Sequence, residues 1–401
     1  MQFEQKQAIS TGSVLWIVRI LVFATFFDLF VQYPIAAPYA STLGASPAFV
    51  GAIVAAYSVA NLAGNLVAGI ALDRIGRFPL LVAGTFGTAA VVATYAVVSS
   101  PTELFALRLL HGLVVAALAP GSFALSGDSV PAEERARAMG INGAIIAFAA
   151  IVAPAFAGIV QERYGFATVF LADALLLAVT GVVVALSVRS VRVAEANVRA
   201  TSGLAPTWSI VRRLADPYVA VLAFTVALGA FVTALPERLQ ALGIAPSVRG
   251  AAFSTYGIVA ALVMVSPLVG RVARRDWARA VTLGLAMIAV GLAVTGADAS
   301  ARGIERLTLG GAGLFGLGFG FLFPALTAEV ARRAGRGERG RAFGWFYALY
   351  SLGVVAGSLL AGTIGEFFGS QTGWPLVAGG SVSALGAALC HSLSRRRVRN
   401  A

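Results

Sequence analysis

Three ionisable residues stand inside long apolar segments of this chain and are its first candidates for chemistry. Asp28 lies in an apolar run that begins near Ser13, and Arg108 and His111 lie in a run that begins near Thr102. A charged side chain costs about 3 kcal/mol or more at the centre of a bilayer, so an ionisable residue there is by default a functional one. Burial favours the neutral form of a carboxyl group, whereas a nearby arginine favours the ionised form. Asp28 is therefore expected to bind a proton or a cationic substrate.

Helix geometry places Asp28 and Arg108 at a similar depth. Asp28 is about 22 Å along its helix, and Arg108, approached from the opposite side, is about 21 Å from the same face of a core of about 30 Å. We expect an Asp28–Arg108 pair, in which Arg108 either tunes the acid or holds an anionic substrate. His111 lies one turn deeper on the same face. It is expected either to relay a proton, since its unperturbed pKa is about 6.5, or to form a hydrogen bond between helices.

Polar and aromatic side chains accompany these ionisable groups. Thr25, Asp28 and Gln32 are three and four residues apart, which puts them on one helix face. Asn61 belongs to a similar stripe in the second apolar run, and Tyr33 follows Gln32. Aromatic rings in a cavity suit an apolar or cationic guest. The alternatives are hydrogen bonding between helices for the polar residues and plain packing for the rings.

Two further carboxyl groups lie nearer the ends of apolar runs. Asp173 falls about 9 Å from the surface in the sixth run, and we interpret it as structural or interfacial. Glu237 falls at the end of the seventh run, where it is expected to guard the mouth of a pathway.

The elements that must position these residues are membrane-spanning helices. The chain of 401 residues is 58% hydrophobic and 12% charged, whereas globular proteins are about a quarter charged. The net charge of +12 comes largely from arginines in short loops. Basic residues placed there set membrane orientation, which makes nucleic-acid binding the weaker interpretation. A single cysteine excludes disulfide frameworks and cysteine-rich metal sites.

Twelve apolar runs are long enough to span a bilayer, and the first is read as a retained helix rather than a signal peptide. They begin near Ser13, Phe49, Pro79, Thr102, Ala138, Phe166, Pro217, Gly250, Ala280, Leu307, Phe343 and Trp374. We predict an N-terminal six-helix bundle (1–188), a cytoplasmic linker (189–216) and a C-terminal six-helix bundle (217–401). With the N-terminus inside, 23 of the 30 basic residues lie on the inner side and five lie outside. The positive-inside rule then predicts cytoplasmic termini in a plasma (inner) membrane.

The two halves of the sequence repeat each other. Pro47, Gly51 and Tyr57 recur as Pro246, Gly250 and Tyr256 at an offset of 199, and Gly158 and Gly165 recur as Gly362 and Gly369 at an offset of 204. A register held over two regions predicts two structural repeats, as in transporters whose halves rock around a central site.

The loop after the second run carries a recognisable motif, Gly69-Ile-Ala-Leu-Asp73-Arg74-Ile-Gly76-Arg77. This resembles the signature loop of the major facilitator superfamily. The resemblance covers the whole chain and implies an all-α membrane protein of twelve helices in two six-helix pseudo-repeats. It also implies that Gly69 and Gly76 allow close packing, and that Asp73, Arg74 and Arg77 form a cytoplasmic gate.

Other motifs place the chain near one branch of that superfamily. Arg108-Leu-Leu-His111-Gly112 is similar to a family pattern in which glutamine usually takes the position of His111. Pro154 and Gly158 resemble the helix-packing motif of the exporters, although alanine replaces glycine at three other positions of that motif. Pro34 and Pro38 resemble the proline pair of the twelve-helix drug:proton antiporters.

These features favour transport over catalysis. Lys6 is the only lysine, which excludes a phosphate-gripping lysine in a Gly-rich loop. His111 and His391 stand alone, and no His-Glu-x-x-His motif suggests a metal. We expect a monomeric secondary transporter without cofactors that exports hydrophobic or cationic small molecules in exchange for protons. The alternatives are a proton-coupled importer of a small organic anion or metabolite, and a lipid or lysolipid transporter.

Overall fold

The fold is known from a computed structural model that describes residues 11–131, 133–187, 208–267, 276–298, 301–334 and 338–399, with the side chains of 11–13, 66, 69–75, 136, 208, 301, 340 and 394–399 left out. The elements of the first half are α1 (Thr11–Val31), α2 (Ala36–Thr42), α3 (Pro47–Ile75), α4 (Arg77–Thr94), the 3₁₀ turn η1 (Tyr95–Val97), α5 (Pro101–Val115), α6 (Leu118–Asp128) and α7 (Arg135–Leu186). Those of the second half are α9 (Trp208–Arg213), α10 (Ala215–Ala241), α11 (Pro246–Val265), α13 (Trp277–Gly296), α14 (Ala301–Arg333), α15 (Arg339–Phe368) and α16 (Trp374–Arg399). The described residues thus form an all-helical protein, as predicted.

Eleven helical segments within these ranges are long and apolar enough to cross a membrane. One of them, α7, has 52 residues and would be about 78 Å long if straight, more than twice the thickness of a bilayer core. The chain instead reverses at Gly165, whose φ of 83° and ψ of 175° are not helical. With α7 counted as two spans, the twelve predicted spans are confirmed, and the observed helices begin within six residues of the predicted starts.

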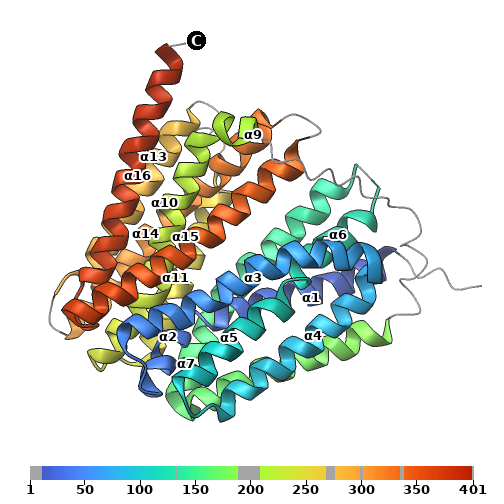
Figure 1. The fold of residues 1–401 in the computed structure, drawn as a ribbon, viewed down its shortest axis with the longest axis horizontal. Coiled ribbons are helices and arrows are strands. Elements are labelled where there is room, and N and C mark those ends of the chain that lie inside the picture. The colour runs from blue at the N-terminus through green and yellow to red at the C-terminus, as the bar shows by residue number, and fades with distance from the viewer. Residues whose placement is uncertain are drawn as a thin grey trace, which may run out of the picture.

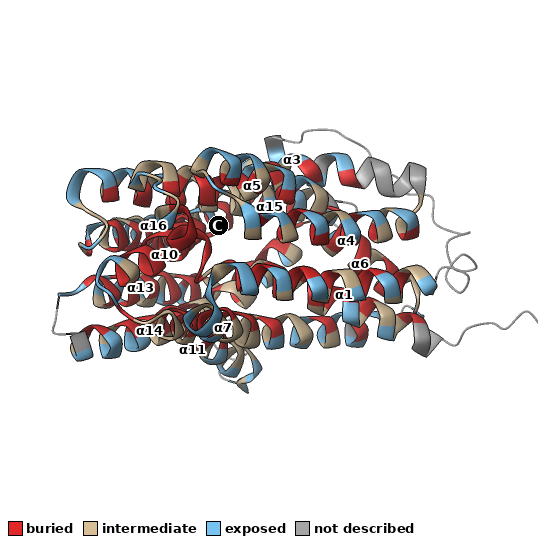
Figure 2. Cartoon of the chain, turned by 90° about the horizontal axis from the view of Figure 1, so that it is seen from below, coloured by how far each residue is buried: buried red, intermediate tan, exposed pale blue. Residues whose placement is uncertain are grey.

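The helices form two bundles that converge at one end and diverge toward the other (Figure 1). In the second bundle α10 is the central helix, with 89% of its span buried, and Figure 2 shows it surrounded by its neighbours. The predicted linker 189–216 lies largely outside the described residues, except that its last part forms α9 and the start of α10.

The predicted repeat is visible in the backbone. Gly44 and its counterpart Gly243 have φ of 89° and 69°, and Gly165 and its counterpart Gly369 have φ of 83° and 88°. Positive φ is strained for residues with a Cβ, which explains glycine at both members of each pair. The same turn therefore ends the same helix in each half.

Four glycines at the converging end hold the halves together. A Cβ on Gly51 would lie 2.5 Å from the Ser358 carbonyl oxygen, and a Cβ on Gly250 would lie 2.3 Å from the Pro154 carbonyl oxygen. The same Cβ atoms would lie 3.0 Å from the Gly362 Cα and 3.2 Å from the Gly158 Cα, respectively. The contacts α3–α15 and α7–α11 are thus related by the internal repeat, and they place the predicted packing motif between the halves.

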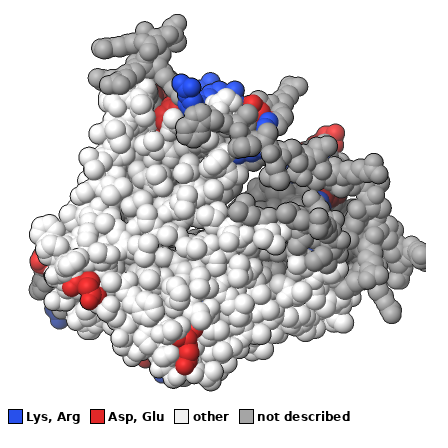
Figure 3. All heavy atoms as spheres, viewed as in Figure 1, with Lys and Arg blue, Asp and Glu red and all other residues white. Residues whose placement is uncertain are grey.

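Hydrogen bonds reinforce this end of the molecule, which we call the closed end. The Gln240 side chain donates to the Pro38 carbonyl (3.1 Å), the backbone N–H of Ser247 donates to Glu162 (3.0 Å), and Arg249 donates to Gln161 (3.1 Å). We call the opposite end, which carries Arg77, Asp128, Arg213 and Arg333, the basic end. Figure 3 shows arginine side chains gathered at this end of the second half and an almost uncharged belt below them. Such a belt fits a hydrocarbon core.

Candidate proton and substrate site

Asp28 and His111 meet in the interior of the first bundle. Asp28 lies on α1 and His111 on α5, and neither side chain is exposed. The Nε2 atom of His111 is 3.0 Å from Oδ2 of Asp28. The other oxygen, Oδ1, has no hydrogen-bond partner among the described residues. The two predicted site residues therefore form one buried, hydrogen-bonded pair.

The second ring nitrogen of His111 extends this pair into a chain of three groups. Its Nδ1 atom is 3.0 Å from the hydroxyl of Tyr95, which lies on η1 and is fully buried. Nε2–H donates to the carboxylate when Nδ1 accepts from the hydroxyl, so both contacts are satisfied by neutral imidazole. The ring of Tyr57 meets the imidazole edge-on at 5.1 Å.

Arg108 occupies a neighbouring position and does not pair directly with Asp28. Its guanidinium lies over the ring of Tyr57, 4.8 Å from the ring centre, and its Nε and Nη1 atoms have no acceptor among the described residues. The expected Asp28–Arg108 ion pair is thus replaced by Asp28–His111. The physical reason is that His111 fills the space beside Asp28, while the π face of Tyr57 stabilises the guanidinium.

Asp173 also lies in this interior, so of its two predicted roles, structural or interfacial, the interfacial one is wrong. The second part of α7 carries Asp173 to a fully buried position three residues after Phe170, whose ring meets that of Tyr95 at 5.2 Å, and the carboxyl groups of Asp173 and Asp28 interact. Neither oxygen of Asp173 has a hydrogen-bond donor among the described residues. Its sequence signal was a lone carboxyl group in an otherwise apolar span.

The predicted polar residues around Asp28 have different roles. The hydroxyl of Thr25 donates to the carbonyl of Leu21 (2.8 Å) within α1, so it is engaged in its own helix. The side chain of Gln32 is buried, and its Nε2 has no partner among the described residues. Asn61 donates to the carbonyl of Gly112 (3.3 Å) and thereby links α3 to α5. Gln32 is therefore the polar neighbour with free donor capacity.

Aromatic rings connect the two halves. Tyr33 meets Phe253 of α11 at 5.7 Å, and Phe253 meets Phe231 of α10 at 5.0 Å. Phe231 stacks on Phe315 of α14 at 4.7 Å. Predicted Tyr33 therefore begins a continuous aromatic path from the first bundle into the core of the second.

The predicted gate motif lies at the basic end. Gly69, Asp73 and Arg74 have side chains outside those that the structure describes. Gly76 forms the turn between α3 and α4 with φ of 94°, and Arg77 makes an ion pair with Asp128 at the end of α6. Asp128 was not predicted as a site residue, although an acidic residue at the end of the fourth span could have indicated it.

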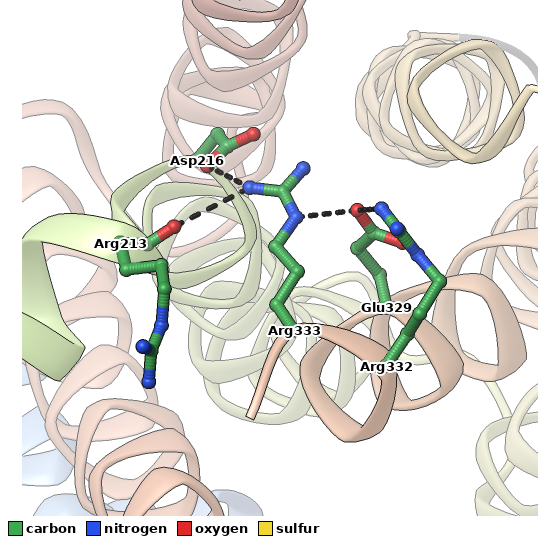
Figure 4. Close-up of polar contacts among 5 residues, drawn as sticks. All are labelled: Arg213, Asp216, Glu329, Arg332 and Arg333. Carbon is green, nitrogen blue, oxygen red and sulfur yellow. Dashed lines mark hydrogen bonds and ion pairs between the residues drawn. The ribbon is translucent and has the colours of Figure 1, made fainter. Parts of the chain in front are cut away.

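The second half has a different charge cluster at the same end (Figure 4). Arg333 contacts Glu329 (2.5 Å) one turn earlier on α14 and Asp216 (2.8 Å) at the start of α10. Arg332, with a largely exposed side chain, also contacts Glu329 (2.6 Å). Both carboxylates are nearly fully buried, so Arg333 is the main charge that compensates them.

The chain resembles known transporters over most of its length. It is 32% identical over 182 residues to the vesicular acetylcholine transporter of Rattus norvegicus, covering 43% of this chain but only 32% of that protein. It is 25% identical over 86% of its length to the inner membrane transport protein YajR of Escherichia coli, of which 75% is covered. It is 23% identical to the multi-drug resistance efflux pump PmrA of Streptococcus pneumoniae, with 75% of each protein covered.

Solved structures agree with the fold. A crystal structure of the peptide transporter POT in complex with sulfate superposes with a TM-score of 0.79 at 15% identity, covering 96% of this chain and 94% of that one. The sequence model of the Major Facilitator Superfamily matches residues 19–237 and 217–400, which together span nearly the whole chain. Since the duplicated twelve-span architecture fits as well, the chain belongs to the major facilitator superfamily and is a multi-pass membrane protein.

Proposed function

We propose that this protein is a proton-coupled secondary transporter that exports hydrophobic or cationic small molecules across the plasma (inner) membrane. It works as a monomer by alternating access, and the proton gradient is its only energy source. The observation that carries the proposal is the buried chain Asp28–His111–Tyr95, with contacts of 3.0 Å on each side of the imidazole.

This chain of groups has the chemistry of a proton site. Burial disfavours the ionised form of a carboxyl group, so a buried acid that loses its partner takes up a proton. His111 contacts Asp28 through one ring nitrogen and Tyr95 through the other, so it is suited to pass a proton to or from Asp28. A change in helix packing that separated Asp28 from His111 would change the proton affinity, which is what coupling requires.

The aromatic path from Tyr33 to Phe315 supports a hydrophobic or cationic substrate. Aromatic faces attract cations and bury apolar groups. The relatives point the same way, since one is named for transport of the cation acetylcholine and another for multidrug efflux.

The closed end supports alternating access. The excess of basic residues assigns the basic end to the cytoplasm, by the positive-inside rule. The closed end is then extracellular, and the structure represents an inward-facing state. The opposite state requires the glycine contacts Gly51–Gly362 and Gly158–Gly250 to separate.

The test uses purified protein in proteoliposomes that contain a pH-sensitive dye, under an imposed proton gradient. Lipophilic cations are expected to trigger proton movement in the wild type and not in Asp28→Asn. Glu305→Gln is the matched control, because Glu305 is an exposed carboxylate on α14 outside the cluster. Cation-triggered proton movement retained in Asp28→Asn would refute Asp28 as the coupling acid.

A second candidate function is proton-coupled import of a small organic anion. The observation that favours it is Arg108, a buried guanidinium with two nitrogen atoms that lack acceptors among the described residues. Such a group is suited to bind a carboxylate. In the same assay, proton movement triggered only by organic anions and lost in Arg108→Gln would select this function over export.

A further inference from the structure

The cluster contains one more carboxyl group than a simple Asp–His proton relay needs. Asp28 and Asp173 come from α1 and α7, helices that pack directly against each other, and both side chains are fully buried. Three of their four carboxyl oxygens, Oδ1 of Asp28 and both oxygens of Asp173, have no donor among the described residues. A buried carboxylate without donors is costly, so something must satisfy these oxygens.

A proton is the simplest ligand that satisfies them. Ionising two interacting carboxylates together is unfavourable in a buried site of low polarity, whereas a carboxylic acid donates one hydrogen bond to a neighbouring carboxylate. Among the described residues, the side chains of Asp28, Asp173 and His111 do not form a group that could hold a metal ion. The geometry therefore favours a shared proton over a metal ion.

The surrounding groups set the charge balance of this pair. His111 of α5 contacts Asp28 directly, and Tyr95 of η1 and Tyr57 of α3 contact His111. Arg108 of α5 lies over the ring of Tyr57. His111 can stay neutral, because its two contacts are satisfied by neutral imidazole. Arg108 is then the single positive charge of the cluster. With one shared proton the two carboxyl groups carry one negative charge, and the cluster is neutral overall.

We propose that Asp28 and Asp173 form a carboxyl–carboxylate pair that holds one shared proton, and that this pair is the proton-binding site of the transporter. This inference deepens the proposed function and rests on it only for the statement that the proton is the transported one. Release of the proton leaves two carboxylates against one guanidinium. A monovalent cation that enters as the proton leaves restores neutrality, so the pair predicts exchange of one proton for one monovalent cation.

Infrared difference spectroscopy on purified protein at neutral pH tests the shared proton without any transport measurement. The wild type is expected to show the carbonyl band of a protonated carboxylic acid. Asp173→Asn is expected to lose this band, because the remaining Asp28 has His111 as a hydrogen-bond partner. Asp28→Asn is expected to shift the band, because an amide replaces the carboxylate that accepts the shared proton from Asp173. Other buried acids, such as Glu237, contribute equally to all spectra and cancel in the differences.

Two results would overturn the shared proton. If the band is lost in Asp173→Asn but keeps its position in Asp28→Asn, Asp173 holds a proton of its own and is a structural acid. If neither variant changes the band, both groups are ionised. If Asp173→Asn fails to fold, a band that keeps its position in Asp28→Asn is enough to exclude the shared proton.

Transport measurements distinguish an error in this inference from an error in the proposed function. In proteoliposomes, the pH midpoint of cation-triggered proton movement is expected to fall by about one unit or more in Asp173→Asn, because the like charge that retains the proton is gone. A midpoint unchanged from wild type would contradict a role of Asp173 in coupling. If the wild type moves no protons with any compound, the proposed function fails, whereas the infrared result still decides whether the pair shares a proton.

Discussion

Replacing Gly250 by alanine is expected to shift the protein away from the conformation in which the closed end is packed. The new Cβ would lie 2.3 Å from the Pro154 carbonyl oxygen and 3.2 Å from the Gly158 Cα, whereas ordinary contacts begin at 3.4 Å. Both neighbours are backbone atoms, so α7 and α11 must separate by about 1 Å. Overpacking of this kind costs about 1–3 kcal/mol, which corresponds to a change of about 5- to 150-fold in a two-state equilibrium.

Distances between spin labels at the closed end measure this shift. Val97 and Ala297 are exposed residues of the first and second half at this end, and cysteines are introduced there after Cys390 is replaced by alanine. Gly250→Ala is expected to add a population with a longer distance. The matched control is Gly310→Ala, because a Cβ on Gly310 has no neighbour within 4 Å.

The internal repeat adds a second test of the same reasoning. Gly51→Ala places its Cβ 2.5 Å from the Ser358 carbonyl oxygen and is expected to open the closed end to a similar extent. The reasoning is refuted if neither variant changes the label distances, or if Gly310→Ala changes them as much.

Two further predictions concern the basic end. Arg333→Ala should lower the free energy of unfolding by about 3 kcal/mol, because Glu329 loses a partner while buried, whereas Arg332→Ala should cost at most about 1 kcal/mol. Thermal unfolding in detergent compares the two, and equal losses would contradict the role of Arg333. Asp128→Asn should change transport turnover several-fold with little effect on substrate binding, because it removes the ion pair with Arg77 at the predicted gate. A loss of binding affinity alone, measured by titration calorimetry, would argue against a gating role.

The sequence alone was sufficient for the architecture. Hydrophobic length is a local property, so the twelve spans could be read from segments of about 20 residues. The offsets of 199 and 204 predicted which glycines correspond, and Gly44, Gly165, Gly243 and Gly369 share positive φ as the repeat requires. The fold therefore follows from the apolar length of single segments and from the repeat between the two halves.

The partners inside the site were decided by the tertiary structure. Depth estimates placed Asp28 and Arg108 at one level, but depth does not give the rotation of each helix about its axis. That rotation brings His111 rather than Arg108 against Asp28. Asp173 illustrates the same limit. Its span carries no other charge, and the residue with which it interacts, Asp28, is 145 residues away in the sequence. Which side chains meet depends on how helices distant in sequence pack, because the packing of a whole bundle sets their rotation and tilt.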